Sequence, residues 1–344
     1  MDSLTQAVLG ASIAGAVAPA GQRRKALLVG AALGTLPDLD VVIDYGDAVK
    51  NFTYHRSFSH SLIVLAPFSV LLWLLLRRWW APVREAPLRW LAVIGLALLT
   101  HPLLDAHTAY GTQLFWPLTV RPTMWGTLFI IDPLYTLPLL VGTLLAAFWP
   151  AGKWSDTLLR SALALSTLYI GWSWIGQSIV ERHTDAALAA MGLQGARVFL
   201  TPTPFNTLLW RVVVLTDEGY LEGFDSLLVD EGQMHFEAYE SDQQALAAAS
   251  DIWAVARLRW FSNDFVKSHV DDGKLIVSDL RMGRNRPMYS LMPPLPGAIR
   301  TGTKFRRNVS RPRSATGLCP KPGGASGLIR PSTQPRLRQF ALKQ

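Results

Sequence analysis

Six apolar segments, separated by polar connections, occupy the first 180 residues of the chain. They cover residues 4–18, 26–36, 61–76, 90–104, 128–149 and 157–180. Because a helix needs about 20 apolar residues to cross the hydrocarbon core, only the last two segments approach the required length. The first two are short and rich in Gly and Ala, which favours close packing of helices. We therefore predict a polytopic, mainly α-helical membrane bundle with about four to six membrane helices.

The composition agrees with a membrane protein. Half of the 344 residues are hydrophobic and 17% are charged, compared with roughly 25% charged residues in soluble domains. The net charge of +8 comes from residues 297–344, which hold 11 Lys or Arg and no acidic residue, whereas the rest has 22 basic and 25 acidic residues. The folded part is therefore not expected to bind nucleic acid specifically. The single cysteine, Cys319, excludes an intramolecular disulfide and a multi-cysteine metal site.

Basic residues concentrate in alternate connections between the apolar segments. They are Arg23, Arg24, Lys25, Arg77, Arg78, Arg84, Arg89, Lys153 and Arg160. Because cytoplasmic loops of membrane proteins are enriched in Lys and Arg, we expect these connections on the cytoplasmic side. Residues 37–60, 105–127 and everything after residue 180 then lie together on the opposite side.

Histidine and aspartate residues gather where the apolar segments begin or end. The runs are TLPDLD at 35–40, HRSFSHS at 55–61 and HPLLD at 101–105. His101 and Asp105 are four residues apart, so a helix places them on one face. All three runs fall on the same predicted side of the membrane and offer a mixed nitrogen and oxygen set suited to Zn²⁺ or Mn²⁺. The predicted metal ligands are Asp38, Asp40, His55, His60, His101 and Asp105.

Each of these runs also has a structural interpretation. The two aspartates of TLPDLD can cap a turn after Pro37. The histidines of HRSFSHS can cap a helix at the membrane interface, and the HPLLD pair can form a buried His–Asp hydrogen bond. Arg56 can either clamp a phosphate or pair with an aspartate of the site. Ser59 and Ser61 are expected to be helix N-caps rather than nucleophiles.

The sequence pattern changes near residue 197. The runs WRVVVLT, GYLEGFDSLL, HFEAYE and KLIVSDL are typical of strands, and residues 243–261 repeat apolar side chains at helical spacing. After about residue 293, a composition rich in Pro, Gly, Ser and Arg cannot bury a core. We therefore expect a membrane-embedded domain over 1–185, an α+β domain over 196–293 and a disordered basic tail over 294–344.

Most of residues 1–285 resemble the longer members of the YdjM-type family of inner-membrane proteins, which are grouped with metal-dependent hydrolases. The matching runs are DSLTQAVLGA, LPDLD, HRSFSHS, HPLLDAHTAYGTQLFWP, IIDPLYTLPLL, TPTPFNTLLWRVV, GYLEGFDSLL and SDLRMG. The resemblance implies a helical fold distantly similar to zinc-dependent phospholipase C and P1-type nucleases, in which His and Asp residues hold metals that activate water against a phosphoester. Relatives often carry Thr-His near the N-terminus, whereas Gln6 follows Thr5 here. Glutamine is a poor metal ligand, so this departure concerns one ligand position or a second metal.

Together, these observations predict a metal-dependent hydrolase of the bacterial inner membrane, with its site and C-terminal domain on the extracytoplasmic side. The metal would lower the pKa of a bound water, Asp38 would take the proton, and Arg56 would neutralise developing negative charge. The position at the membrane face and the resemblance favour a phosphoester or lipid-linked substrate, with membrane lipids as partners. The alternative is a non-catalytic membrane scaffold in which a metal or a His–Asp network is structural. The sequence has no Walker-type loop, dinucleotide fingerprint or GxSxG motif.

Overall fold

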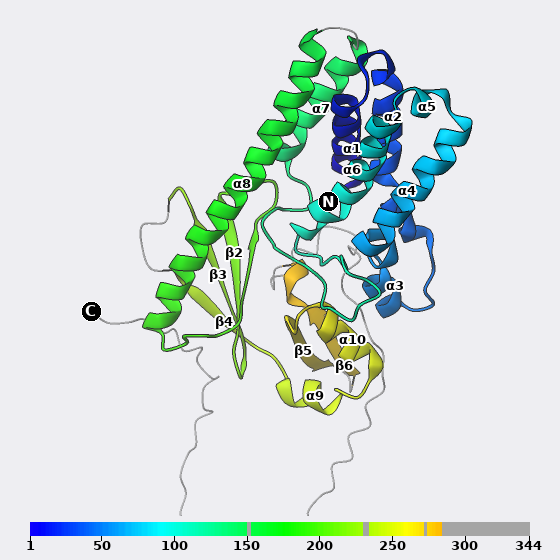
Figure 1. Cartoon of the computed structure of the whole chain (residues 1–344). Helices are drawn as coiled ribbons and strands as arrows, with labels where there is room; N and C mark the ends of the chain where they lie inside the picture. Colours follow the sequence, from blue (N-terminus) through cyan, green and yellow to red (C-terminus); the bar gives the residue numbers. More distant parts are fainter. Residues whose placement is uncertain (150–152, 230–233, 272–273, 284–344) are drawn as a thin grey trace, which may run out of the picture. The chain divides into compact units, whose positions relative to one another are not determined.

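A computed structural model describes residues 1–149, 153–229, 234–271 and 274–283, which lie within one compact unit, Met1–Phe305 (Figure 1). The described residues before 196 are mostly helical, and those after it form two small sheets with two short helices. The predicted disordered tail at 294–344 lies outside the described residues. The predicted domain boundaries near 185 and 196 stay a prediction.

All six apolar segments form helices, which confirms the mostly helical N-terminal region. The main helices are α1 (Ser3–Val17), α2 (Arg23–Thr35), α4 (Leu62–Trp79), α6 (Pro87–Ala106), α7 (Pro133–Phe148) and α8 (Lys153–Ala190). Shorter elements lie between them, of which those labelled η are 3₁₀-helices. They are η1 (Ala20–Gln22), η2 (Pro37–Val42), α3 (Ala48–Tyr54), η3 (Phe58–His60) and α5 (Ala81–Glu85).

Within the described part of the chain, two helices are long and apolar enough to cross a membrane. They are α4, with 18 residues, and α6, with 20, while α1 and α7 are apolar but shorter. The expectation that the segments at 128–149 and 157–180 come closest to spanning length was wrong for the first, because α7 has only 16 residues. For the second it is confirmed in length, because α8 has 38 residues, but α8 is not apolar enough to be one of these two helices. The Asp132 carboxylate accepts hydrogen bonds from two backbone N–H groups and Pro133 is the first helical residue, so α7 begins late and has 16 residues. The count of four to six membrane helices stays a prediction.

Helices α1 and α2 pack with their backbones in close contact, as their Gly and Ala content predicted. A Cβ atom added to Gly10 would lie 2.2 Å from the Gly30 carbonyl oxygen. One added to Gly34 would lie 2.4 Å from the carbonyl oxygen of Gln6. Only glycine permits this approach, which brings the C-terminal end of α2 against α1 beside the polar residues of TLPDLD.

The region after residue 196 contains a four-stranded antiparallel sheet and a two-stranded one. The first has the order β1 (Val198–Pro202), β2 (Leu209–Leu215), β3 (Gly219–Ser226) and β4 (Phe236–Glu240). The second pairs β5 (Val266–Asp271) with β6 (Lys274–Asp279), and the chain between the sheets forms α9 (Gln243–Ala248) and α10 (Trp253–Phe261). Four strands were predicted and β1 and β5 were not. The single helix predicted over 243–261 was wrong, because the chain turns between α9 and α10.

The C-terminal elements share a core with α3. Val49 of α3 is buried in one apolar cluster with Leu246 of α9, Val255 of α10 and residues of both β5 and β6. Helix α10 lies beside α3 (Figure 1). There, the Arg257 guanidinium donates to the Thr53 hydroxyl at 3.0 Å. This packing anchors the segment that leads directly into the HRSFSHS run.

Candidate metal centre

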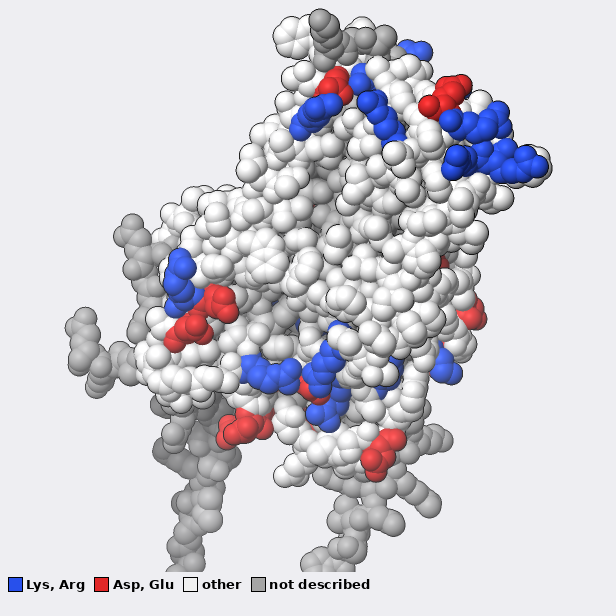
Figure 2. Space-filling view, in the orientation of Figure 1, with Lys and Arg blue, Asp and Glu red and all other residues white. Residues whose placement is uncertain are grey.

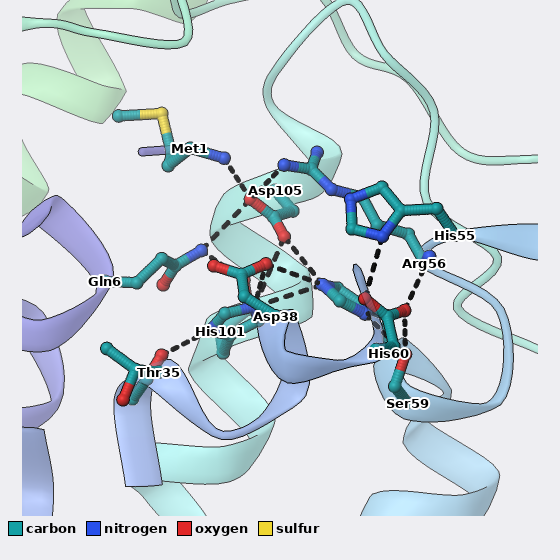
Figure 3. Close-up of polar contacts among 12 residues, drawn as sticks. Met1, Gln6, Thr35, Asp38, His55, Arg56, Ser59, His60, His101 and Asp105 are labelled. Carbon is teal, nitrogen blue, oxygen red and sulfur yellow. Dashed lines mark hydrogen bonds and ion pairs between the residues drawn. The ribbon is translucent and has the colours of Figure 1, made fainter. Parts of the chain in front are cut away.

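The three polar runs converge at one end of α6, as predicted (Figure 3). Asp38 comes from η2, directly after α2, and His60 comes from η3, directly before α4. His101 and Asp105 lie one turn apart on α6, with the spacing that places them on one face. These four residues form a group that can hold a metal ion, with one ligand atom from each and all four atoms within 4.8 Å of one another.

Local sequence explains why η2 and η3 end at the site. Pro37 is the first residue of η2 and ends the helical path of α2. The Ser61 hydroxyl accepts a hydrogen bond from the Ile63 backbone N–H, which confirms Ser61 as the N-cap of α4. His60 is therefore held at the junction between a one-turn helix and a membrane-length helix.

Five of the six distances between the four ligand atoms are close to those of a tetrahedral site, and the sixth, between the Asp38 and Asp105 oxygens, lies within 4.8 Å. Nε2 of His60 lies 3.1 Å from Nε2 of His101 and 3.1 Å from Oδ2 of Asp105. Oδ1 of Asp38 lies 3.4 Å from both ring nitrogens, and His101 Nε2 lies 3.4 Å from Asp105 Oδ2. Tetrahedral zinc with bonds of about 2.0–2.2 Å places its ligand atoms roughly 3.3–3.6 Å apart. A small divalent cation could therefore be held between these atoms.

When both imidazoles are neutral, their hydrogen bonds leave both Nε2 lone pairs facing the centre. His101 Nδ1 lies 2.6 Å from the carbonyl oxygen of Gly34, which can only accept, so Nδ1 carries the proton. His60 Nδ1 lies 2.9 Å from the Ser59 hydroxyl oxygen. Because Ser59 gives its own proton to Asp40, His60 Nδ1 donates to Ser59. This orientation by a hydrogen bond on the remote nitrogen is typical of metal-binding histidines.

The charge and solvation of the group also require a cation or a proton. Oδ2 of Asp105 is buried and has no hydrogen-bond partner among the residues that the structure describes. The side chains of His60, His101 and Asp105 are 0% exposed, and that of Asp38 is 16% exposed. Buried lone pairs that face one another repel and lack water, so an arrangement without a cation or an added proton is unfavourable.

The second oxygen of Asp105 is held from the opposite side. Oδ1 accepts a hydrogen bond from Gln6 Nε2 at 3.0 Å and forms an ion pair with Arg56 Nη2 at 3.4 Å. The amino group of Met1 also contacts Oδ1. Gln6 is therefore outside the four-residue group and orients one of its carboxylates.

Asp40 and His55, the other two predicted ligands, lie beside the group and not in it. Oδ1 of Asp40 is 2.7 Å from His55 Nδ1, and Oδ2 accepts hydrogen bonds from the Arg56 backbone N–H at 3.0 Å and from the Ser59 hydroxyl. Burial would raise the pKa of Asp40, but the hydrogen bonds and charge of His55 outweigh that effect and lower it. The ionised Asp40 is thus fully engaged in holding the loop that carries His60, and its direct binding to a metal stays a prediction.

Arg56 adopts a positive φ of 61°, and its side chain reaches Asp105 of α6. The guanidinium pairs with Asp105, lies 3.5 Å from the Thr108 hydroxyl and covers the Tyr110 ring. Its Nε is buried and unpartnered within the described ranges. Of the two interpretations of Arg56, pairing with an aspartate of the site is therefore observed, and a spare donor remains.

Sequence reasoning missed two groups that orient the ligands. Ser59 was expected to cap a helix, but it connects Asp40 to His60. The Gly34 carbonyl fixes the His101 ring, and its only sequence signal is the Gly30–Gly34 spacing that allows α1 and α2 to approach. Both depend on contacts between segments distant in the sequence.

The chain is similar to known proteins over its N-terminal half and beyond. A family model described as YdjM inner membrane protein matches residues 1–180. The chain is 35% identical over 91 residues to "Inner membrane protein YbcI" of Escherichia coli (strain K12), which is 26% of this chain and 51% of that protein. It is 24% identical over 230 residues to "Uncharacterized protein YfhP" of Bacillus subtilis (strain 168), which is 65% of this chain and 68% of the relative.

The chain thus spans about half the length of the E. coli relative that it matches. No solved structure matches it, so the similarity to zinc phospholipase C and P1-type nucleases stays a prediction. The family model nevertheless covers more than half of the 344 residues and includes all three polar runs. The chain belongs to the YdjM inner membrane protein family.

Proposed function

We propose that this protein is a membrane-bound, metal-dependent hydrolase whose cation is held by Asp38, His60, His101 and Asp105. The observation that carries the proposal is the set of four ligand atoms within 4.8 Å of one another, two of them imidazole nitrogens with their remote nitrogens already donating. Two nitrogen and two carboxylate ligands suit Zn²⁺ best, and Mn²⁺ is the second choice.

A bound divalent cation would supply a water of lowered pKa and would polarise the scissile bond. Asp38 is the most accessible of the four residues, so we assign the approach of water and substrate to its side. One oxygen of its carboxylate faces the two imidazoles at 3.4 Å. The other oxygen can accept a proton as water is deprotonated, which makes Asp38 the proposed general base.

Arg56 is the proposed stabiliser of negative charge. Its guanidinium is buried, lies 3.4 Å from Asp105 and keeps the Nε donor without a partner among the described residues. A planar, permanently charged group with a free donor suits the oxygens of a phosphoester in the transition state. A phosphoester or a lipid-linked phosphate is therefore the substrate class that we propose.

The proposed topology puts the site and the C-terminal sheets on the extracytoplasmic side of the bacterial inner membrane. Figure 2 shows Lys and Arg gathered over α5 and the neighbouring helix ends, as the positive-inside rule predicts for a cytoplasmic face. Arg77 and Arg78 lie in the last turn of α4 and Arg84 in α5, whereas the four-residue group lies at the opposite end of α6.

One observation favours a second candidate function, a membrane scaffold with a structural metal. Four protein ligands grouped within 4.8 Å, three of them buried, resemble a closed site, and catalytic zinc usually keeps one position for water. Protonation of one imidazole would also allow a metal-free His–Asp network. Under this alternative, the group would stabilise the junction of α2, α4 and α6 without turnover.

A comparison of metal content with turnover distinguishes these functions. The full chain, purified in lipid nanodiscs, is assayed for bound metal and for hydrolysis of a panel of soluble and lipid phosphoesters, together with His101→Ala. His269→Ala is the matched control, because His269 is exposed on β5. Metal-dependent turnover that is lost in His101→Ala and kept in His269→Ala supports the hydrolase. Bound metal whose removal lowers the melting temperature, with no turnover on any substrate, contradicts it and supports the scaffold.

A further inference from the structure

The 3₁₀-helix that supplies Asp38 also carries an exposed apolar surface. Leu39, Val41 and Val42 of η2 and Ile43, directly after it, are 56%, 72%, 79% and 41% exposed. We call these four residues the η2 apolar face. Large apolar side chains that are exposed in a contiguous group mark a surface that contacts a membrane, a ligand or another protein.

The geometry of η2 links this face to the candidate metal centre. In a 3₁₀-helix, residues three apart lie above one another. Pro37 and Asp40 form the row that is buried against the protein. Asp38 and Val41 form the next row, so an exposed valine adjoins the one ligand of the group that is partly open to solvent.

The η2 apolar face is continuous with the surface of α4. Elements η2 and η3 pack together, and the Ser59 hydroxyl of η3 donates to Asp40 of η2. Element η3 leads directly into α4, whose buried residues are Leu65 and Ser69, so most of this membrane-length helix presents apolar side chains outward. Phe58 of η3 and Ile63 in the first turn of α4 are 38% and 44% exposed, so exposed apolar side chains lie on both sides of this junction.

This continuity identifies what covers the η2 apolar face. The outward side chains of α4 meet lipid if α4 crosses the bilayer, and the η2 apolar face lies where that helix begins, at the level of the interface. Apolar side chains beside polar backbone are favourable there, because the side chains enter the acyl region while carboxylates remain among the headgroups. A soluble partner protein could cover the η2 apolar face only if it had an apolar surface of its own that stopped at the membrane interface, where α4 begins.

We propose that the η2 apolar face inserts into the membrane interface and opens the Asp38 side of the metal centre toward lipid. The substrate is then an amphipathic phosphoester that keeps its chain in the bilayer while its headgroup reaches the metal. The statement about substrate rests on the proposed hydrolase function. The statement about insertion does not, because it follows from the exposed residues and from α4.

Insertion is tested first, by a measurement that needs no activity. Cys319, the single cysteine, is replaced by Ser, and a spin label is attached to Val42→Cys in the full chain in phosphatidylcholine nanodiscs. Leu71→Cys, on the exposed side of α4, is the lipid reference, and Val270→Cys, on exposed β5, is the water reference. We expect the label at Val42 to collide with oxygen more, and with a water-soluble nickel complex several-fold less, than the label at Val270. Equal accessibility of Val42 and Val270 to the nickel complex overturns the proposal.

The substrate statement is tested with Val42→Asp, which lies outside the row of Asp38, and the control Val270→Asp. Val42→Asp should raise KM several-fold for a long-chain lipid phosphate in vesicles and leave kcat and the hydrolysis of a short-chain soluble analogue unchanged. An equal loss with both substrates overturns lateral access from the bilayer. If no substrate is hydrolysed at all, the hydrolase proposal and the substrate statement fail together, and the spin-label result still decides insertion.

Discussion

Nε2 of His60 and Nε2 of His101 face one another at 3.1 Å, and each ring uses its Nδ1 for a different acceptor. With both imidazoles neutral, neither ring has a second proton to share, so this arrangement with two carboxylate oxygens favours a bound cation. The metal-dependent account of this protein depends on that relationship, and the following predictions test its parts.

Removal of the metal should destabilise the whole helical bundle. The ligands come from η2, η3 and α6, so a cation links segments that are otherwise joined by packing. A ligand present at 100 times its dissociation constant stabilises the folded state by about 2.7 kcal/mol. We expect a chelator to lower the melting temperature in detergent and added Zn²⁺ to restore it. His269→Ala should show the same response to chelator and Zn²⁺ as the wild type, and His60→Ala should lose it. That pair of results would show that the effect comes from this centre.

Ser59→Ala should weaken metal binding without abolishing it. The variant keeps all four ligands but removes the hydroxyl that accepts from His60 Nδ1 and donates to Asp40. Loss of such an orienting partner lowers metal affinity roughly 10- to 100-fold. Competition with a zinc-binding dye measures the change, and Ser250→Ala, an exposed serine before α10, is the control. Equal affinities in the two variants would show that Ser59 does not orient the ring.

Gly34→Ala should impair both packing and the metal centre. The added Cβ would lie 2.4 Å from the Gln6 carbonyl oxygen, so α1 and α2 must separate. The Gly34 carbonyl accepts from His101 Nδ1, and the shift would disturb that bond as well. Overpacking of this kind lowers the free energy of unfolding by about 1–3 kcal/mol. Gly21→Ala is the control, because a Cβ added there meets nothing within 4 Å. Equal melting temperatures of Gly34→Ala and Gly21→Ala would refute the steric argument.

Acid should weaken the anchoring of the turn after α10 through Asp264. Burial would raise the pKa of Asp264, but ion pairs with Arg121, Arg259 and Arg197 outweigh it and lower the pKa below its ordinary value of 3.8. The unfolded chain therefore takes up this proton at a higher pH than the folded chain. The contribution of Asp264 is complete above pH 3.8 and is lost as the pH falls through the lower folded pKa.

The variant Asp264→Asn tests this pH dependence. Asparagine tolerates the positive φ of 64° at this position but carries no titrating charge. Melting temperatures of both proteins are measured in detergent over a descending pH series. The variant should be less stable at neutral pH, and the difference should shrink below pH 3.8. A difference that is constant with pH would contradict the assignment.

Much of the candidate centre could be predicted, because its ligands obey local rules. Helical spacing predicted that His101 and Asp105 lie on one face of a helix. The positions of TLPDLD and HRSFSHS at the ends of apolar segments predicted that they lie on the same side of the membrane as this pair. The sequence could not separate Asp38 from Asp40. Successive residues of a 3₁₀-helix are about 120° apart, so two aspartates at i and i+2 point in different directions. Only the packing of η2 on η3 determines which of them faces the histidines.

The C-terminal elements show the same limit. Residues 243–261 repeat apolar side chains at helical spacing and contain no Gly or Pro, which favours one helix. The chain instead turns at 249–252, and this allows Leu246 of α9 and Val255 of α10 to enter the same core as Val49 of α3. Tertiary packing overrides local propensity there.

X-ray absorption at the zinc edge of the zinc-loaded full chain tests the central claim most directly. The account predicts one zinc per chain with four nitrogen or oxygen ligands at about 2.0–2.2 Å and outer-shell scattering from two imidazoles, reduced to one imidazole in His101→Ala. A spectrum with no imidazole scattering, or one that is identical in the wild type and in His101→Ala, would contradict it.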